Sequence, residues 1–301
     1  MKALLTIWKF SRPHTIIGSV ISIITLYFIV CDKKEIQCLS YLIPALIIGI
    51  TCNIFIVGLN QIADINLDKI NKPYLPLPSG TLSPTQAWLI VSIALSISLG
   101  LALFITPYLF GIIALAAAIG WAYSMPPFYL KKHHLTAALS ISTVRGLLLN
   151  AGGFMVFNYL VNDTLVMPEN VKILTVFIIV FSIAISWFKD LPDMEGDARY
   201  NIQTLAILYS PKMVLISGHL LVGMAYLFTI YMNYAEYKAS ATPSHQTTIL
   251  LSGHLLLLGL FVFNAVSIKS TRHFSFKIFY KRFWWFFFAE YLLYLLAYAI
   301  S

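Results

Sequence analysis

Charge is scarce in this sequence. Of its 301 residues only 11% are Asp, Glu, Lys or Arg, whereas 59% are apolar. Soluble domains are normally about 25% charged, so this composition excludes an ordinary soluble protein. No long hydrophilic segment interrupts the chain, and we expect residues 1–301 to form a single membrane-embedded domain.

Cysteine is also rare, and Cys31, Cys38 and Cys52 lack metal-ligand spacing. They are interpreted as small hydrophobic side chains, with a Cys31–Cys38 disulfide as the alternative.

Long apolar runs are what the sequence has instead. A helix needs about 20 apolar residues to cross the hydrocarbon core of a bilayer. Nine stretches satisfy this length: 15–31, 41–60, 84–105, 107–124, 136–160, 171–189, 211–232, 248–268 and 283–300. The sequence therefore predicts an all-α, multi-pass integral membrane protein with nine transmembrane helices. The segment from Lys2 to Val30 is predicted to be one continuous first helix.

The basic residues are distributed unevenly between the two ends of this predicted bundle. Fifteen of the 20 Lys and Arg residues fall at one end, and Arg145 falls inside a span. The four at the other end are Lys33, Lys34, Lys172 and Lys238. The positive-inside rule places the basic end and the N-terminus in the cytoplasm and the C-terminus outside. The net charge of +8 then reflects topology and contact with the lipid bilayer, so neither a nucleic-acid nor a protein partner is predicted.

Acidic residues are rarer still, and six of the twelve lie in two short clusters. The first cluster is Asn60, Asp64 and Asp68, and the second is Asp190, Asp193, Glu195 and Asp197. Each follows an apolar span that ends at the basic, cytoplasmic end. On a helix the first three side chains occupy an arc of about 80° over about 12 Å. The second set falls within a narrower arc if its helix continues past Pro192.

Carboxylates this close repel one another unless cations lie between them. Mg²⁺ suits such clusters, because it binds through one or two carboxylates while substrate phosphates complete its coordination. The pattern therefore predicts an Mg²⁺ cofactor and a diphosphate substrate. The alternative is that these are solvated loop acids that balance nearby Lys and Arg residues.

Two sequence runs carry a resemblance to a known family. NQIADINLDKINKP at 60–73 and KDLPDMEGD at 189–197, together with the nine spans, resemble the UbiA superfamily of intramembrane prenyltransferases. SRPHTIIGS at 11–19 and NKPYLPLPSG at 71–80 are most similar to its homogentisate prenyltransferases, which act in tocopherol and plastoquinone synthesis. The resemblance covers the whole chain. It implies a helical bundle around a central cavity that binds a prenyl diphosphate and an aromatic acceptor.

The resemblance also implies roles for individual residues. The catalytic residues would be Asp64, Asp68, Asp190, Asp193 and Asp197, and the metal would be bound by these five together with Asn60. Several related subfamilies carry Arg where this chain has Leu75, so another cation must neutralise the phosphates. The candidates for binding the diphosphate are Lys72, Tyr123, Ser124, Lys131, Lys189 and Arg199. Tyrosine and lysine are also common at membrane interfaces in the absence of any function.

Arg145 is exceptional because it falls well inside a predicted span. A buried guanidinium needs a partner, which could be a structural carboxylate, the carboxylate of an aromatic acid, or the leaving diphosphate. We favour a ligand over a structural ion pair, with Asn150 sharing the same pocket. Arg12 and His14 are further candidates for binding the acceptor, although their alternative roles are membrane anchoring and a solvated loop histidine. Glu290, on the last span, is expected to have a polar partner.

The predicted function is Mg²⁺-dependent transfer of a phytyl or geranylgeranyl group from its diphosphate to homogentisate, with decarboxylation. Other acceptors of the superfamily remain open, namely those of menaquinone, ubiquinone, chlorophyll and archaeal glyceryl-lipid synthesis. A hypothesis of a different class is a divalent-cation transporter or channel. Transport would require ionisable residues near the bilayer midplane, whereas both acidic clusters are predicted at one surface.

A proline-rich connector follows the first acidic cluster. Pro73, Pro76 and Pro78 exclude a helix there, and the connector could act as a lid over the diphosphate. Ser83, followed by Pro84 and Gln86, forms a capping-box pattern that predicts the start of the next helix.

Overall fold

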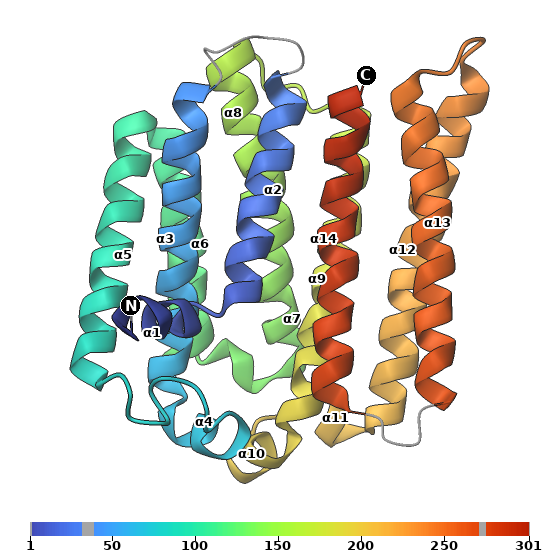
Figure 1. Cartoon of the computed structure of the whole chain (residues 1–301). Coiled ribbons are helices and arrows are strands. Elements are labelled where there is room, and N and C mark those ends of the chain that lie inside the picture. The colour runs from blue at the N-terminus through green and yellow to red at the C-terminus, as the bar shows by residue number, and fades with distance from the viewer. Residues whose placement is uncertain (1, 32–38, 271–274, 301) are drawn as a thin grey trace.

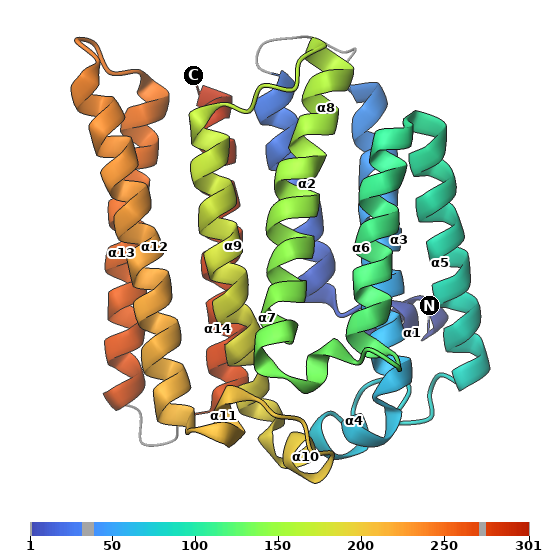
Figure 2. The same cartoon turned by 180° about the vertical axis from the view of Figure 1, so that it is seen from behind.

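A computed structural model describes residues 2–31, 39–270 and 275–300 of the chain. Within these residues the fold is a bundle of long helices that run side by side, with short helices gathered at one end (Figures 1 and 2). Nine helical segments of the described chain are long and apolar enough to cross a membrane. The protein is therefore an all-helical, multi-pass membrane protein, as predicted.

The spanning helices match the predicted apolar runs closely. Eight of them are α2 (Pro13–Cys31), α3 (Leu39–Ala63), α5 (Pro84–Ile105), α6 (Pro107–Ser124), α9 (Glu169–Asp190), α12 (Pro211–Ala239), α13 (His245–Ser270) and α14 (Phe276–Ile300). The ninth segment is composite: α7 (His134–Ser142), the π-helical η3 (Thr143–Gly152) and α8 (Gly153–Asn162). The clearest difference in bounds is that α14 begins at Phe276 rather than near residue 283. Cys38 lies outside the described residues.

The prediction of one continuous helix from Lys2 to Val30 is wrong. A separate helix, α1 (Lys2–Phe10), lies across the bundle, and α2 begins only at Pro13 (Figure 1). Arg12 between them adopts a left-handed conformation with φ of 51°. The physical reason is proline, which disfavours a helical conformation for the preceding residue and is well placed at the first position of a helix. Phe10 at the end of α1 is fully buried.

The short helices collect at the end of the bundle where the acidic clusters lie. They are α4 (Ile65–Asn71), η2 (Leu130–Lys132), η4 (Leu191–Asp193), α10 (Met194–Arg199) and α11 (Leu205–Leu208). The second acidic helix does not continue unbroken past Pro192: a 3₁₀ turn, η4, separates α9 from α10. Proline lacks the N–H of a regular helix and its ring clashes with the preceding turn. As a result α10 changes direction and contacts α4.

The connector between α4 and α5 contains no helix, and α5 begins as predicted. Ser83 Oγ accepts the Gln86 N–H at 3.2 Å, and Gln86 Oε1 accepts the Ser83 N–H at 3.0 Å. This reciprocal pair is the predicted capping box. Leu75 and Leu77 of the connector are buried, so this segment packs against the bundle.

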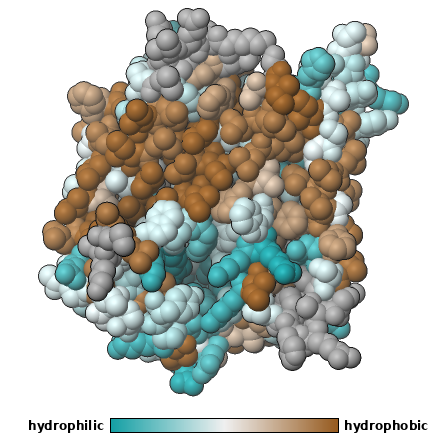
Figure 3. Space-filling model, in the orientation of Figure 1, coloured by the Kyte–Doolittle hydropathy of each residue, from teal (hydrophilic) through white to brown (hydrophobic). Residues whose placement is uncertain are grey.

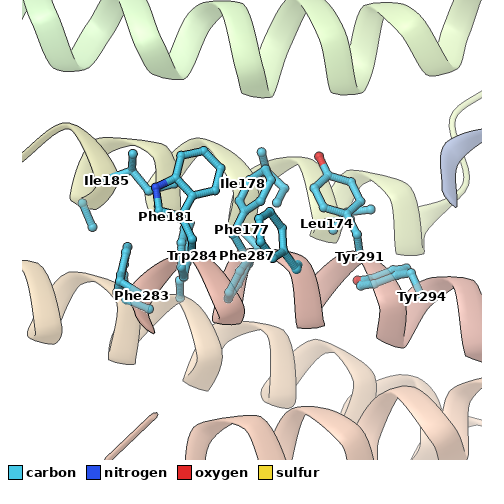
Figure 4. Packing of buried hydrophobic residues seen from close by; sticks show 14 of the residues in the cluster. Leu174, Phe177, Ile178, Phe181, Ile185, Phe283, Trp284, Phe287, Tyr291 and Tyr294 are labelled. Carbon is cyan, nitrogen blue, oxygen red and sulfur yellow. The ribbon is translucent and has the colours of Figure 1, made fainter. Parts of the chain in front are cut away.

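A seam of aromatic rings joins α9 to α14. Figure 4 shows side chains from the two helices facing one another along this seam. Phe181 of α9 stacks on Phe283 of α14 with ring centroids 4.4 Å apart, and Phe287 is also buried in the seam. Close packing of this kind is the main source of helix association in a membrane, where lipid is as apolar as the side chains. The seam fixes α14, which supplies several walls of the cavity described next.

Candidate active site

A cavity inside the bundle is lined by most of the site residues predicted from the sequence. Figure 3 shows a hollow surrounded by hydrophilic side chains in the lower part of the molecule, at the end where Figure 1 places α4 and α10. The lining includes Asn60, Asp64, Asp68, Asp190, Asp193, Asp197, Arg12, Lys72, Lys131, Lys189, Arg145, His14 and Tyr123. The two acidic clusters therefore face the same space, although more than 120 residues separate them in the sequence.

Asn71 connects the two acidic segments. Its Oδ1 accepts the backbone N–H of Gly196 at 2.8 Å, and its Nδ2 lies 3.5 Å from Asp197 Oδ1. A Cβ atom on Gly196 would lie 2.6 Å from the Asn71 amide, so only glycine permits this approach. We did not predict either residue to belong to the site. The available signal was their placement inside the acidic runs, Asn71 three residues after Asp68 and Gly196 next to Asp197.

Basic side chains already occupy the space between the carboxylates. Lys131 forms an ion pair with Asp64, and Lys72 forms one with Asp193. Lys72 also lies 3.8 Å from Asp68. The other contacts are Lys189 to Asp190 at 2.8 Å, Arg12 to Asp68 at 3.9 Å, and Asn60 Nδ2 to Asp64 Oδ2 at 3.1 Å. These pairs remove the repulsion that bare carboxylates would suffer, and they hold four cations where a diphosphate would bind.

Burial and ion pairing shift the pKa values of this cluster in opposite directions. Burial raises the pKa of Asp68 above its usual range, although Lys72 and Arg12 oppose the change. Burial also lowers the pKa of Lys131, and Asp64 only partly offsets this effect. For Lys72 burial acts to lower the pKa, but Asp193 and Asp68 outweigh it and the pKa rises. Lys72 is therefore held as a cation, whereas the charge of Lys131 depends more on its partner.

The residues of the acidic end fit a hard divalent cation. Asp68 Oδ2 and Asp193 Oδ1 are buried and accept no hydrogen bond among the described residues, although Asp68 Oδ2 lies 3.9 Å from the Arg12 guanidinium; both are hard oxygen donors that a cation could use. No group of three or more acidic, His or Cys side chains in the described chain converges on a single point. This arrangement suits Mg²⁺, which takes one or two carboxylates and obtains its other oxygens from water and phosphate.

Two predicted diphosphate ligands lie outside the cavity lining. Arg199 pairs with Glu195 at 2.8 Å, and both side chains are more than half exposed, so the guanidinium faces solvent instead of the cavity. Helix α10 brings Arg199 next to Glu195, one turn earlier on the same helix, whereas Gly196 and Asp197 are the residues of α10 that contact Asn71. Ser124 is buried at the end of α6 and is absent from the lining. Neither position supports the contact predicted for it.

The other end of the cavity is basic and aromatic. The Arg145 guanidinium carbon lies 4.9 Å from the centroid of Trp284 and 5.2 Å from that of Phe287. His14 packs edge-on against Trp284 at 4.9 Å. Tyr280 lines the same region. The cavity thus has an end rich in carboxylates and lysines and an end where one guanidinium lies among aromatic rings.

Asn150 lines a smaller recess behind Arg145, and both residues border it as predicted. The π-helical geometry of η3 explains this, because residues five apart lie on one face of a π-helix. The Asn150 amide is already bonded: Nδ2 donates to Thr175 Oγ1 at 2.7 Å, and Oδ1 accepts from the Tyr291 hydroxyl at 2.8 Å. A direct contact to an acceptor would have to compete with these bonds.

Glu290 has the polar partner that the sequence could not identify. His254 Nε2 lies 2.9 Å from Glu290 Oε1, and both side chains are fully buried. This pair joins α13 to α14 outside the cavity lining, so Glu290 belongs to the structure of the bundle.

Comparison with known proteins identifies the family. The model of the "UbiA prenyltransferase family" matches residues 20–288. The chain belongs to this family. It is 38% identical to homogentisate phytyltransferase of Synechocystis sp. over 99% of this chain and 96% of that protein. It is 33% identical to a probable homogentisate phytyltransferase 2 of Oryza sativa over 95% of this chain and 76% of that protein.

Solved structures show the same fold. A UbiA homologue from Archaeoglobus fulgidus bound to GPP and Mg²⁺ superposes with a TM-score of 0.67 at 16% identity, covering 98% of this chain and all of that one. The protein is thus a UbiA-family prenyltransferase, and the hypothesis of a cation transporter is set aside.

Proposed function

We propose that this UbiA-family protein transfers a phytyl or geranylgeranyl group from its diphosphate to homogentisate, with Mg²⁺ as cofactor and loss of CO₂. The observation that carries the proposal is the cavity with two different ends, one of carboxylates and lysines and one of Arg145 among aromatic rings. Relatives that share a third or more of its residues are described as homogentisate phytyltransferases. We further propose that residues 1–301 act as one membrane domain, with the acidic end and the N-terminus in the cytoplasm.

The acidic end would bind the donor. Mg²⁺ would be held by Asn60, Asp64, Asp68, Asp190, Asp193 and Asp197. When bound, it would neutralise the diphosphate and make it a better leaving group. The structural homologue from Archaeoglobus fulgidus was solved with GPP and Mg²⁺. Lys72, Lys131 and Lys189 would move from carboxylate oxygens to phosphate oxygens as the donor binds, since charge-assisted hydrogen bonds to phosphate are strong. Tyr123 lies beside Lys189, whose Nζ is 5.8 Å from the centroid of its ring.

The walls of the cavity would protect the reacting carbon. The allylic C–O bond breaks, its electron pair leaves with the diphosphate, and the resulting carbocation must not meet water. Ile56, Val144 and Ile185 are among the apolar residues of the lining, and Tyr280 and Trp284 offer aromatic faces that stabilise a cation. The acceptor ring then forms the new C–C bond and loses a proton, while its benzylic carbon gains a proton as CO₂ leaves.

The test is a product assay with purified protein in detergent or nanodiscs. Homogentisate and the competing acceptors of the family are supplied with phytyl and geranylgeranyl diphosphate, and products are identified by mass spectrometry. We expect prenylated methylhydroquinone only with Mg²⁺ present, and its loss in Asp64→Ala and Asp193→Ala proteins that remain folded. Full activity in these variants would contradict the metal assignment, and preference for a naphthoate, a hydroxybenzoate, a chlorophyllide or a glyceryl lipid would contradict the proposed acceptor.

A further inference from the structure

Arg145 is a half-buried cation that lines the cavity and has no ion-pair partner among the described residues. Its guanidinium carbon lies 4.9 Å from the ring centroid of Trp284 and 5.2 Å from that of Phe287. None of the ion pairs among the described residues includes it, and its Nη1 is buried without a hydrogen-bond partner. A guanidinium buried in a membrane protein is costly unless an anion or a set of acceptors compensates it. Arg145 therefore has hydrogen-bond donors available for a ligand.

The Asn150 amide and the cavity carboxylates already have other partners. Asn150 shares the recess, but its amide oxygen already accepts from Tyr291 and its nitrogen donates to Thr175. The cavity carboxylates are paired with Arg12, Lys72, Lys131 and Lys189 at the opposite end. The missing counter-charge must therefore come from a bound molecule.

The walls beside Arg145 fit a flat ring. Trp284 and Phe287 cannot retreat, because a Cβ atom added to Gly18 of α2 would lie 3.2 Å from each of them, so the backbone of α2 supports these rings from behind. On the side of the cavity, His14 meets Trp284 edge-on at 4.9 Å. A guanidinium between fixed aromatic faces presents a planar fork of N–H donors, which matches a carboxylate in a bidentate manner.

A diphosphate is the competing anion. It would be met by three lysines and Arg12 at the acidic end, next to the Asp68 and Asp193 oxygens that accept no hydrogen bond and suit Mg²⁺. An anion at Arg145 would lack any neighbouring carboxylate with which to share a metal ion. A singly charged carboxylate needs only one guanidinium and no metal ion.

We propose that Arg145 is the specificity-determining residue for the acceptor: it binds the carboxylate of an arylacetate whose ring lies against Trp284, and so selects acidic over neutral hydroquinones. This inference rests on the proposed function, because it assigns the acceptor of that reaction to one end of the cavity. Binding of this carboxylate requires no metal ion or cofactor at Arg145.

The experiment compares two acceptors that differ only in the carboxyl group: homogentisate, and 2-methylhydroquinone, which is homogentisate without CO₂. For Arg145→Gln we expect the KM for homogentisate to rise at least about tenfold, the effect of losing a charged hydrogen bond. The kcat/KM for 2-methylhydroquinone should stay within about threefold. Arg145→Lys should fall between, because lysine keeps the charge and loses the fork. Lys212→Gln removes one positive charge from an exposed position of α12 that is absent from the cavity lining, and it serves as the control.

Two measurements make the outcome decisive. The ratio of the two acceptors within one sample is independent of the folded fraction, so partial misfolding of a variant does not hide the effect. Binding of a non-reactive geranylgeranyl thiodiphosphate with Mg²⁺ should be unchanged in Arg145→Gln. An equal loss for both acceptors, or weakened binding of the thiodiphosphate, would overturn the inference.

Calorimetric titration of homogentisate into wild-type and Arg145→Gln protein separates this inference from the proposed function. If wild-type protein binds homogentisate in an Arg145-dependent manner but forms no prenylated product, the carboxylate site stands and the proposed reaction fails. If product forms but Arg145→Gln binds homogentisate as tightly as wild type, the proposed reaction stands and the carboxylate site at Arg145 fails.

Discussion

The close contact between α4 and α10 leads to a prediction that tests how the active site is assembled. The Gly196 N–H donates to Asn71 Oδ1 at 2.8 Å, and a Cβ atom at residue 196 would lie only 2.6 Å from the Asn71 amide. In Gly196→Ala this distance must open beyond 3.0 Å, because Cβ atoms essentially never approach more closely. The movement breaks the buried hydrogen bond and displaces Asp197, whose Oδ1 lies 3.5 Å from Asn71 Nδ2.

Leaving a buried N–H without its partner costs about 1–3 kcal/mol. If donor binding requires the contact between α4 and α10, this cost lowers the affinity for the donor by about 5- to 150-fold. The assay is calorimetric titration of geranylgeranyl thiodiphosphate with Mg²⁺, together with kcat/KM for the reactive donor. We expect both to fall in Gly196→Ala. Gly223→Ala on α12 is the matched control, because nothing lies within 4 Å of the added methyl group there.

A double-mutant cycle separates the steric effect from a general loss of stability. In an Asn71→Ala background the methyl group at residue 196 no longer meets the amide, so the further effect of Gly196→Ala should be much smaller. Contacting residues typically show coupling of about 0.5–3 kcal/mol. An affinity for the donor within twofold of wild type in Gly196→Ala, or a cycle without coupling, would refute the reasoning.

Two further predictions concern the titration of the cavity and the stability of the bundle. Burial lowers the pKa of Lys131 below its ordinary value of 10.5, so donor affinity should decline with rising pH earlier than for an ordinary lysine. Lys131→Arg should move this decline to higher pH, because the arginine pKa is above about 12, and an unchanged pH profile of thiodiphosphate binding would contradict the role of Lys131. For the buried pair, Glu290→Ala should destabilise the protein by roughly 3–5 kcal/mol, because it leaves His254 without its partner. The amide of Glu290→Gln can still donate a hydrogen bond to the imidazole, so this variant should retain most of the stability in thermal unfolding. An equal loss of stability in both variants would contradict a stabilising role for the His254–Glu290 pair.

Much of the polar lining of the cavity was predictable because its residues are unusual in their surroundings. Carboxylates at the ends of apolar spans are rare enough to stand out, and those predicted do line one cavity. Arg145 stood out for the same reason, as a charge within a span. Arg199 did not follow the prediction, because a basic residue at the correct end of the bundle can equally face solvent, as its contact with Glu195 shows. Proximity in sequence to a site does not determine which face of a short helix a side chain occupies.

The break after Phe10 was also encoded, although we did not predict it. Pro13 disfavours a helical conformation for Arg12 and favours a new helix start, yet the continuous apolar pattern outweighed this local signal in the prediction. The break places Arg12 at the acidic end of the cavity, 3.9 Å from Asp68.

The sequence by itself determined the class, the number of spans in the described chain and the end at which the acids lie. These follow from local rules: a bilayer requires about 20 apolar residues per helix, and a carboxylate cannot remain in hydrocarbon without a partner. Only the tertiary structure decided which residues meet. Asn71 with Gly196 and Lys131 with Asp64 are pairings between distant segments, set by how the helices pack. The π-helical turn that directs Arg145 and Asn150 into one recess likewise depends on packing, because no local sequence pattern distinguishes it from an α-helix.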